Sequence, residues 1–211
     1  VFPVFFAVVE NDLRRVLSYS INNQVGFMVC GVGVGTPLAL NGVAAHAFAD
    51  IFFKGLLMMS MGAVLYRTGT AKASQLGGLH RSMPWTTLFC IIGAMSISAF
   101  PLFSAFVTKS MIISEVATAG YAVIFLMLMF ASAGVLEHSG IKIPYYAFFG
   151  HDSGLRVKEA PFNMLLAMGI AAFIGIFLGL PAIFPGFGHE WLYSLLPYKE
   201  EAMGYSHHHL F

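Results

Sequence analysis

Residues 41–66 read NGVAAHAFADIFFKGLLMMSMGAVLY, a stretch that is mostly apolar and carries one row of titratable side chains. About 20 apolar residues suffice for a helix to cross the hydrocarbon core of a bilayer. His46, Asp50 and Lys54 recur every four residues, so a helix places all three on one face. A charged side chain at mid-membrane costs roughly 2.5–3.5 kcal/mol on insertion scales, and it is tolerated where it faces a bundle interior or water. The stretch therefore predicts a membrane helix whose titratable face is turned inward.

The composition of the whole chain is that of a membrane protein. Of its 211 residues, 58% are hydrophobic and only 10% are charged, whereas about 25% of the residues in an average soluble domain are charged. So few charges cannot cover the surface of a soluble domain, which excludes a cytosolic globular enzyme and a disordered chain. The net charge of +1 gives no basic excess for binding nucleic acid. Cys30 and Cys90 lie in apolar runs, so we expect neither a disulfide framework nor a zinc site.

Further apolar stretches flank residues 41–66 and predict an all-α, polytopic transmembrane helix bundle. Residues 1–9 are apolar but too short to span, and we interpret them as the remnant of a helix whose start is missing. The other runs are continuous and do not alternate as barrel strands do. Pro101 interrupts one of them and Gly140 with Pro144 another, so we expect one or two broken helices. The prediction is about five full spans, at roughly 16–35, 42–66, 84–113, 119–149 and 162–184.

The basic residues orient these spans. Seven of them fall in loops on one side of the predicted bundle, whereas the opposite side has almost none apart from Lys199 in the tail. Because basic loops stay in the cytoplasm, we predict a multi-pass protein of the inner (plasma) membrane with its C-terminus outside. We expect a membrane part over residues 1–184 and an outside tail over residues 185–211. The seven residues are Arg14, Arg15, Arg67, Lys72, Arg81, Arg156 and Lys158.

Two further spans carry titratable residues inside the membrane. Lys109 follows Pro101 by eight residues, and broken helices of this kind recur at ion sites in transporters. An alternative for Lys109 is that its side chain snorkels to the outer interface. Glu137, His138 and Lys142 form a possible secondary site beside the second interruption. A functional and a structural role are equally compatible with their spacing.

Asp50 lies four residues before Lys54, a spacing that suits an ion pair within one helix. Such a pair keeps Lys54 charged, and opening the pair favours release of the proton. His46 extends the row, and histidine in an unperturbed setting titrates near neutral pH. We therefore predict that His46, Asp50, Lys54 and Lys109 carry protons or ions through the membrane. A structural ion pair that only fixes helix packing is the alternative.

Four segments together resemble one family. They are NDLRRVLSYSINNQVGF (11–27), HAFADIFFKGLLMMSMGAVLY (46–66), GGLHRSMPW (77–85) and SAFPLFSAFVTKSMI (98–112). The chain is similar to the C-terminal half of the antiporter-like proton-translocating subunits. These subunits occur in respiratory complex I (NADH:quinone oxidoreductase) and in Mrp-type multi-subunit cation/proton antiporters. The resemblance is clear over about residues 1–115, and we favour the branch of the D-type antiporter subunits.

The resemblance implies more than the spacing does. It implies a fourteen-helix core of two inverted five-helix repeats, of which this chain supplies the second repeat and the helices that follow. It places Lys54 and Lys109 in a central row of Lys, His and Glu residues, with Lys109 on the broken helix. His46 matches a position where relatives often carry His, whereas Asp50 departs from relatives that place His there. The first-repeat half of the path is absent from this chain, so we do not expect the chain to pump alone.

The expected function is proton or Na⁺/H⁺ translocation as a subunit of a multi-subunit cation/proton antiporter. We expect no redox chemistry and no cofactor in the chain itself. The expected partners are other membrane subunits, the lipid bilayer, and H⁺, with Na⁺ as the second candidate ion. No nucleic acid is expected.

Three other functions stay open on the sequence. One is a proton-pumping membrane subunit of a NADH:quinone oxidoreductase or a membrane hydrogenase complex, which shares the path but is driven by quinone chemistry elsewhere. The second is a structural membrane subunit whose charges lock helices together. The third is a membrane metalloenzyme that uses the triplet His207–His209, for which a solvated tail is the favoured interpretation.

Overall fold

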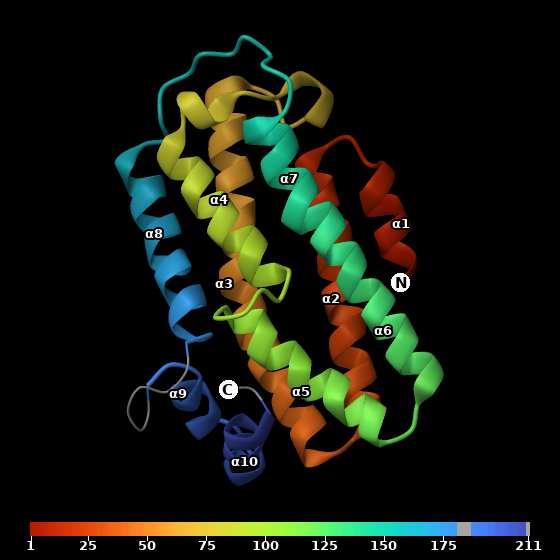
Figure 1. Cartoon of the computed structure of the whole chain (residues 1–211). Coiled ribbons are helices and arrows are strands. Elements are labelled where there is room, and N and C mark those ends of the chain that lie inside the picture. The colour runs from red at the N-terminus through yellow and green to blue at the C-terminus, as the bar shows by residue number, and fades with distance from the viewer. Residues whose placement is uncertain (181–186, 210–211) are drawn as a thin grey trace.

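The computed structural model describes residues 1–180 and 187–209, and it describes side chains as far as residue 205. Within these ranges the chain is a bundle of helices without strands (Figure 1). The helices are α1 (Phe2–Val9), α2 (Leu13–Val34), α3 (Pro37–Thr68), α4 (Pro84–Ile97), α5 (Ser104–Thr118), α6 (Ala122–Val135), α7 (Lys142–Pro144), α8 (Phe162–Phe177), α9 (His189–Ser194) and α10 (Lys199–His209).

Local sequence sets the ends of the two helices that carry most of the polar residues. Asp12 and Thr36 cap the N-termini of α2 and α3, because each side chain accepts a hydrogen bond from a backbone N–H of the first turn. Both helices end at a glycine in the left-handed conformation, Gly35 and Gly69. The chain therefore reverses sharply after Val34, and α3 returns alongside α2 (Figure 1).

Two of the described helices are long and apolar enough to cross a membrane. One is α3, and the other is the continuous helix Ala122–Phe149, which α6 and α7 form with two π-helical segments. Half of the apolar window of α3 is buried, against 28% of that of Ala122–Phe149. The reason is their position, because α3 lies among α2, α4, α5 and α8, whereas Ala122–Phe149 crosses one face of the bundle and leaves its outer side uncovered (Figure 1). The apolar helices α4 and α8 are shorter.

The break expected at Pro101 is confirmed. α4 ends at Ile97 and α5 begins at Ser104, with an irregular loop between them near the middle of the bundle (Figure 1). In that loop Ala99 and Leu102 have φ angles of 58° and 71°. Residues with a side chain rarely adopt this left-handed region. The loop thus turns the chain within the bundle. Its N–H groups at residues 98–100 donate to the carbonyls of Ala94, Met95 and Ser96, and the carbonyl of Ile97 is left for another donor.

The second expected interruption takes another form. Gly140 and Pro144 do not break the helix, which continues from Ala122 to Phe149. Instead, residues 136–141 and 145–149 are π-helical. Local π adjustments are one way in which a membrane helix satisfies the backbone groups that a proline frees. The wider turn also changes where the side chains after residue 135 point, and π segments are frequent at functional sites.

The loops with the basic residues meet at one end of the bundle. The turn before α2, the segment from Gly69 to Met83 and the loop 150–161 all lie there, and α9 and α10 lie at the other end (Figure 1). This arrangement agrees with loops that share one side of a membrane, and the side itself stays a prediction. The predicted boundary at residue 184 and the side chains of His207–His209 lie outside the described residues.

Candidate functional site

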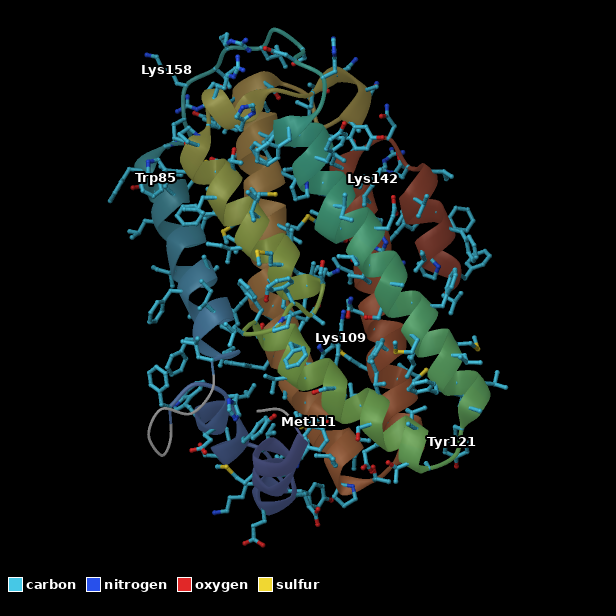
Figure 2. The ribbon with its side chains drawn as sticks, in the orientation of Figure 1. Trp85, Lys109, Met111, Tyr121, Lys142 and Lys158 are labelled. Atoms are coloured by element: carbon cyan, nitrogen blue, oxygen red, sulfur yellow. The ribbon has the colours of Figure 1, made fainter. Side chains whose placement is uncertain are left out.

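All four residues of the predicted row lie inside the bundle. On α3, His46 and Lys54 are 0% and 5% exposed, and Asp50 is half-buried. Lys109 on α5 is 2% exposed and lies near the middle of the bundle (Figure 2). Its Nζ donates a hydrogen bond to the carbonyl oxygen of Ile97, so Lys109 does not snorkel to an interface.

His46 links α3 to two other helices. Its Nδ1 lies 2.8 Å from Thr108 Oγ1 on α5, and its Nε2 lies 2.7 Å from Gln24 Oε1 on α2. Because a carbonyl oxygen can only accept, Nε2 donates to Gln24 and Nδ1 accepts from the hydroxyl of Thr108. A proton added at Nδ1 requires only that the hydroxyl of Thr108 turn and accept. The imidazole can therefore gain and lose a proton without moving its ring.

Lys54 does not form the expected ion pair with Asp50. Its Nζ donates instead to Ser20 Oγ on α2, at 2.5 Å, and no ion pair joins it to Asp50 in the part of the chain that the structure describes. Ser20 Oγ also accepts from Ser139 Oγ, at 3.1 Å. Asp50 Oδ1 is buried without a hydrogen-bond partner among the described residues. The prediction was wrong because the long lysine side chain leaves its own helix and finds a hydroxyl on the neighbouring one.

The break between α4 and α5 provides the acceptor for Lys109. Ile97 is the last residue of α4, and its carbonyl oxygen accepts from Lys109 Nζ at 2.9 Å. Carbonyls at a helix C-terminus have no partner in their own helix and carry a partial negative charge, so an ammonium group is stabilised there. Lys109 Nζ also lies 5.9 Å from the centre of the Phe27 ring, within the range of a cation–π contact.

The four groups act on one another electrostatically. Asp50 interacts with both Lys54 and Lys109, and both lysines interact with His46. The row thus combines two ammonium groups, one carboxylate and one imidazole, all within a buried part of the bundle. Such a set can hold a variable number of protons, because each group that loses its charge changes the field at the others.

The secondary residues act on one another electrostatically, but no hydrogen bond or ion pair joins them within the described part of the chain. Lys142 Nζ caps the C-terminus of α1, where it donates three hydrogen bonds at 2.6–3.0 Å to backbone carbonyl oxygens. Glu137 is exposed on the helix Ala122–Phe149. His138 is buried, and its ring interacts with the backbone of Gly134, one turn earlier in the same helix. Lys142 therefore ties the helix Ala122–Phe149 to the end of α1. The three carbonyls belong to Ala7, Val8 and Glu10.

A known family matches the part of the chain that contains the row. The family model described as "NADH:quinone oxidoreductase/Mrp antiporter, TM" matches residues 1–136, a range that contains the whole row. This chain belongs to that family. The matched range also includes the break between α4 and α5 and the polar face of α2.

Individual members of the NADH:quinone oxidoreductase/Mrp antiporter family match nearly the whole chain. The D-type subunit of a Na(+)/H(+) antiporter from Bacillus subtilis is 31% identical over 203 residues, which are 96% of this chain and 39% of that protein. NADH-ubiquinone oxidoreductase chain 5 from Phytophthora infestans is 30% identical over 203 residues, 89% of this chain and 30% of that protein. A chain in the structure of the Mrp complex from Dietzia shares the fold, with a TM-score of 0.81 at 19% identity, covering 99% of this chain and 45% of that one. The chain thus spans less than half the length of each of these relatives.

Sequence reasoning missed the partners that α2 contributes to this site. Ser20, Asn23 and Gln24 are buried, and their spacing places them on one face of α2. A helix in lipid rarely buries several polar side chains on one face without a partner for them. This pattern could have identified α2 as the helix that faces the row.

Proposed function

We propose that this chain translocates protons, or exchanges them for Na⁺, as a subunit of a multi-subunit cation/proton antiporter. The observation that carries the proposal is the buried row of His46, Asp50, Lys54 and Lys109, whose members act on one another electrostatically. Its two lysines and its histidine are held by neutral partners. The similarity to the D-type subunit of a Na(+)/H(+) antiporter supports the exchange of Na⁺ for H⁺. Because the chain spans 39% of that relative, the activity belongs to the complete polypeptide in its complex.

In the proposed arrangement the chain is the second of two inverted repeats in a fourteen-helix core, together with the helices that follow. Residues 1–184 form the membrane part, residues 185–211 form the outside tail, and the C-terminus lies outside. The proton enters from the cytoplasm through the first repeat and reaches Lys54 and His46. It then passes to Lys109 and leaves on the outer side.

The contacts give each residue a role in this path. Lys54 carries its proton on an ammonium group that donates to one hydroxyl, that of Ser20. His46 relays the proton through its hydrogen bond to the hydroxyl of Thr108, in which either group can be the donor. Thr108 lies one residue before Lys109 on α5. Lys109 binds its proton at the break, where the carbonyl of Ile97 accepts. Asp50 interacts with both lysines and so balances whichever of them is charged.

The test measures proton and sodium translocation by the complete complex in membrane vesicles. Lys54→Ala and Lys109→Ala should each abolish translocation while the complex still assembles, because each removes a group that carries the proton. Lys158→Ala, in an exposed loop, is the matched control and should translocate as the wild type does. Translocation at the wild-type rate in both row variants would overturn the proposal.

A second function is a proton-pumping subunit of a NADH:quinone oxidoreductase, with the redox chemistry in other subunits. The specific observation in its favour is that the identity to chain 5 of that enzyme, 30%, nearly equals the 31% to the D-type antiporter relative. Purification of the complex from its native membrane separates the two. Flavin and iron–sulfur subunits that co-purify with this chain favour the oxidoreductase, and their absence favours the antiporter.

A further inference from the structure

His138 is a buried titratable residue that the proposed path does not use. It is 0% exposed, in the π-helical segment Leu136–Ile141 of the helix Ala122–Phe149. Its neighbour Glu137 is exposed, so the helix turns the carboxylate outward and the imidazole toward the bundle. Because residues of this chain alone enclose the imidazole, its surroundings do not depend on what covers the outer face of the helix.

The π-helical segment that carries His138 is fixed against the row. Ser139 Oγ donates to Ser20 Oγ at 3.1 Å, and Ser20 Oγ also accepts from Lys54 Nζ. A side chain at Gly140 would collide with Ser98 Oγ, the first residue of the break between α4 and α5. The segment is thus held between the hydrogen-bond partner of Lys54 on one side and the break on the other.

The charge that acts most strongly on His138 belongs to Lys54. Its effect exceeds that of Lys142, four residues further along the same helix, and that of Lys109 on α5. Among the helices packed against the segment, α1, α4 and α6 contain no charged residue, and the two arginines of α2 are exposed in its first turn. Two positive charges at His138 and Lys54 repel one another, so one charge between the two is favoured.

The imidazole of His138 is able to accept a proton. Its ring interacts with the backbone of Gly134, and no side chain among the described residues hydrogen-bonds either ring nitrogen. A neutral imidazole has a proton on one nitrogen and a lone pair on the other, so a single backbone contact leaves one nitrogen for proton exchange. Ser20 accommodates both states of Lys54, because its hydroxyl accepts from the ammonium group and can turn to donate to the amine.

We propose that His138 is a further proton-binding residue of the path and that it exchanges one proton with Lys54. In the exchange an N–H bond of the Lys54 ammonium group breaks and an N–H bond forms at a ring nitrogen of His138, so the pair keeps a single positive charge. Lys54 then has two imidazole neighbours, His46 on its own helix and His138 on another, and both lie within electrostatic range of it. This proposal rests on the proposed function.

The first experiment measures translocation by the complete complex in membrane vesicles, normalised to assembled protein. His138→Gln keeps a polar side chain but cannot bind the proton, and it should lower the rate by at least about tenfold. His151→Gln, in the exposed loop, is the matched control and should keep the wild-type rate. A wild-type rate for His138→Gln together with loss in Lys54→Ala would overturn this proposal alone, whereas wild-type rates in both would overturn the proposed function.

The second experiment separates proton binding from packing. A histidine that only packs changes the rate by the same factor at every pH, whereas loss of a proton-binding group changes the shape of the pH profile. For His138→Gln we expect the pH of half-maximal translocation to move by about half a unit or more, and for His151→Gln we expect no movement. The smaller variant His138→Asn repeats both measurements and should give the same results. Profiles that differ from the wild-type profile only by a constant factor would overturn the proposal.

Discussion

Lys54 and Lys142 are both buried lysines, and the two regions around them differ in the acceptors that they provide. Lys142 donates three hydrogen bonds to carbonyls at the end of α1, which uses every donor of its ammonium group. Lys54 has one hydroxyl, and Lys109 has one carbonyl. A lysine with three fixed acceptors cannot lose its proton without leaving carbonyls unpaired, whereas a lysine with one can. We therefore propose that the number of acceptors, more than burial, distinguishes a lysine that caps a helix from one that carries a proton.

The largest expected effect is in the row. Lys54→Met should lower translocation by at least about a hundredfold, because no other group at that place can bind the proton. The thermal stability of the complex should stay equal or rise, since a well-packed apolar side chain replaces a buried charge. Translocation in vesicles and thermal unfolding of the purified complex check both parts. Translocation by Lys54→Met at the wild-type rate would show that a lysine with a single acceptor is not for that reason a proton carrier.

The opposite pattern is expected for the cap of α1. Lys142→Met should lower the free energy of unfolding by about 3 kcal/mol, because the last carbonyls of α1 lose a charged donor. Translocation per assembled complex should be unchanged. Unfolding of the purified complex in denaturant, together with vesicle assays normalised to assembled protein, measures the two effects. Loss of translocation without loss of stability would place Lys142 in the path after all.

A smaller effect is expected from the partner of His46. Thr108→Val keeps the shape but removes the hydroxyl at Nδ1, so the relay loses its donor and acceptor. We expect translocation to fall by about tenfold and stability by about 1 kcal/mol. Thr118→Val, exposed near the end of α5, is the matched control and should match the wild type in the vesicle assay. A wild-type translocation rate for Thr108→Val would show that the hydroxyl of Thr108 has no role in the relay.

The smallest effect is expected outside the membrane, in the loop 150–161. There the Arg156 guanidinium, helped by the backbone N–H of Gly154, holds the pKa of the Asp152 carboxyl below its usual range. This pair stabilises the folded state above the unfolded pKa of about 3.9, and the contribution is lost as the pH falls through the lower folded pKa. Asp152→Asn should lower the melting temperature slightly at neutral pH without changing translocation. The difference from wild type should shrink as the pH drops below about 3.9, and a difference that grows instead would contradict the assignment.

The sequence predicts what depends on neighbours along the chain. The helical class follows from long apolar runs, and the break follows from Pro101, whose effect on the backbone is local. The burial of His46 and Lys54 follows from their shared face on α3. Pro144 shows the limit of this reasoning, because π-helical turns keep the helix continuous where a second break was conceivable.

What the sequence could not predict are contacts between distant segments. The spacing of Asp50 and Lys54 suggests a partner within one helix, but the structure gives Lys54 a hydroxyl from α2. Lys142 binds carbonyls more than 130 residues away along the chain. Both outcomes depend on which helices lie side by side, and a single spacing within one helix contains no information about that.

The left-handed residues at the break have an energetic consequence. Ala99 and Leu102 carry side chains in a conformation that costs of order 1–3 kcal/mol each. Glycine at either position would remove most of that strain, so a chain tuned for stability alone would have glycine there. The packing of α4 and α5 must therefore stabilise the strained conformation of the loop. Any loosening of that packing relaxes the loop next to the carbonyl that binds Lys109, so the backbone strain at the break is coupled to the position of the lysine.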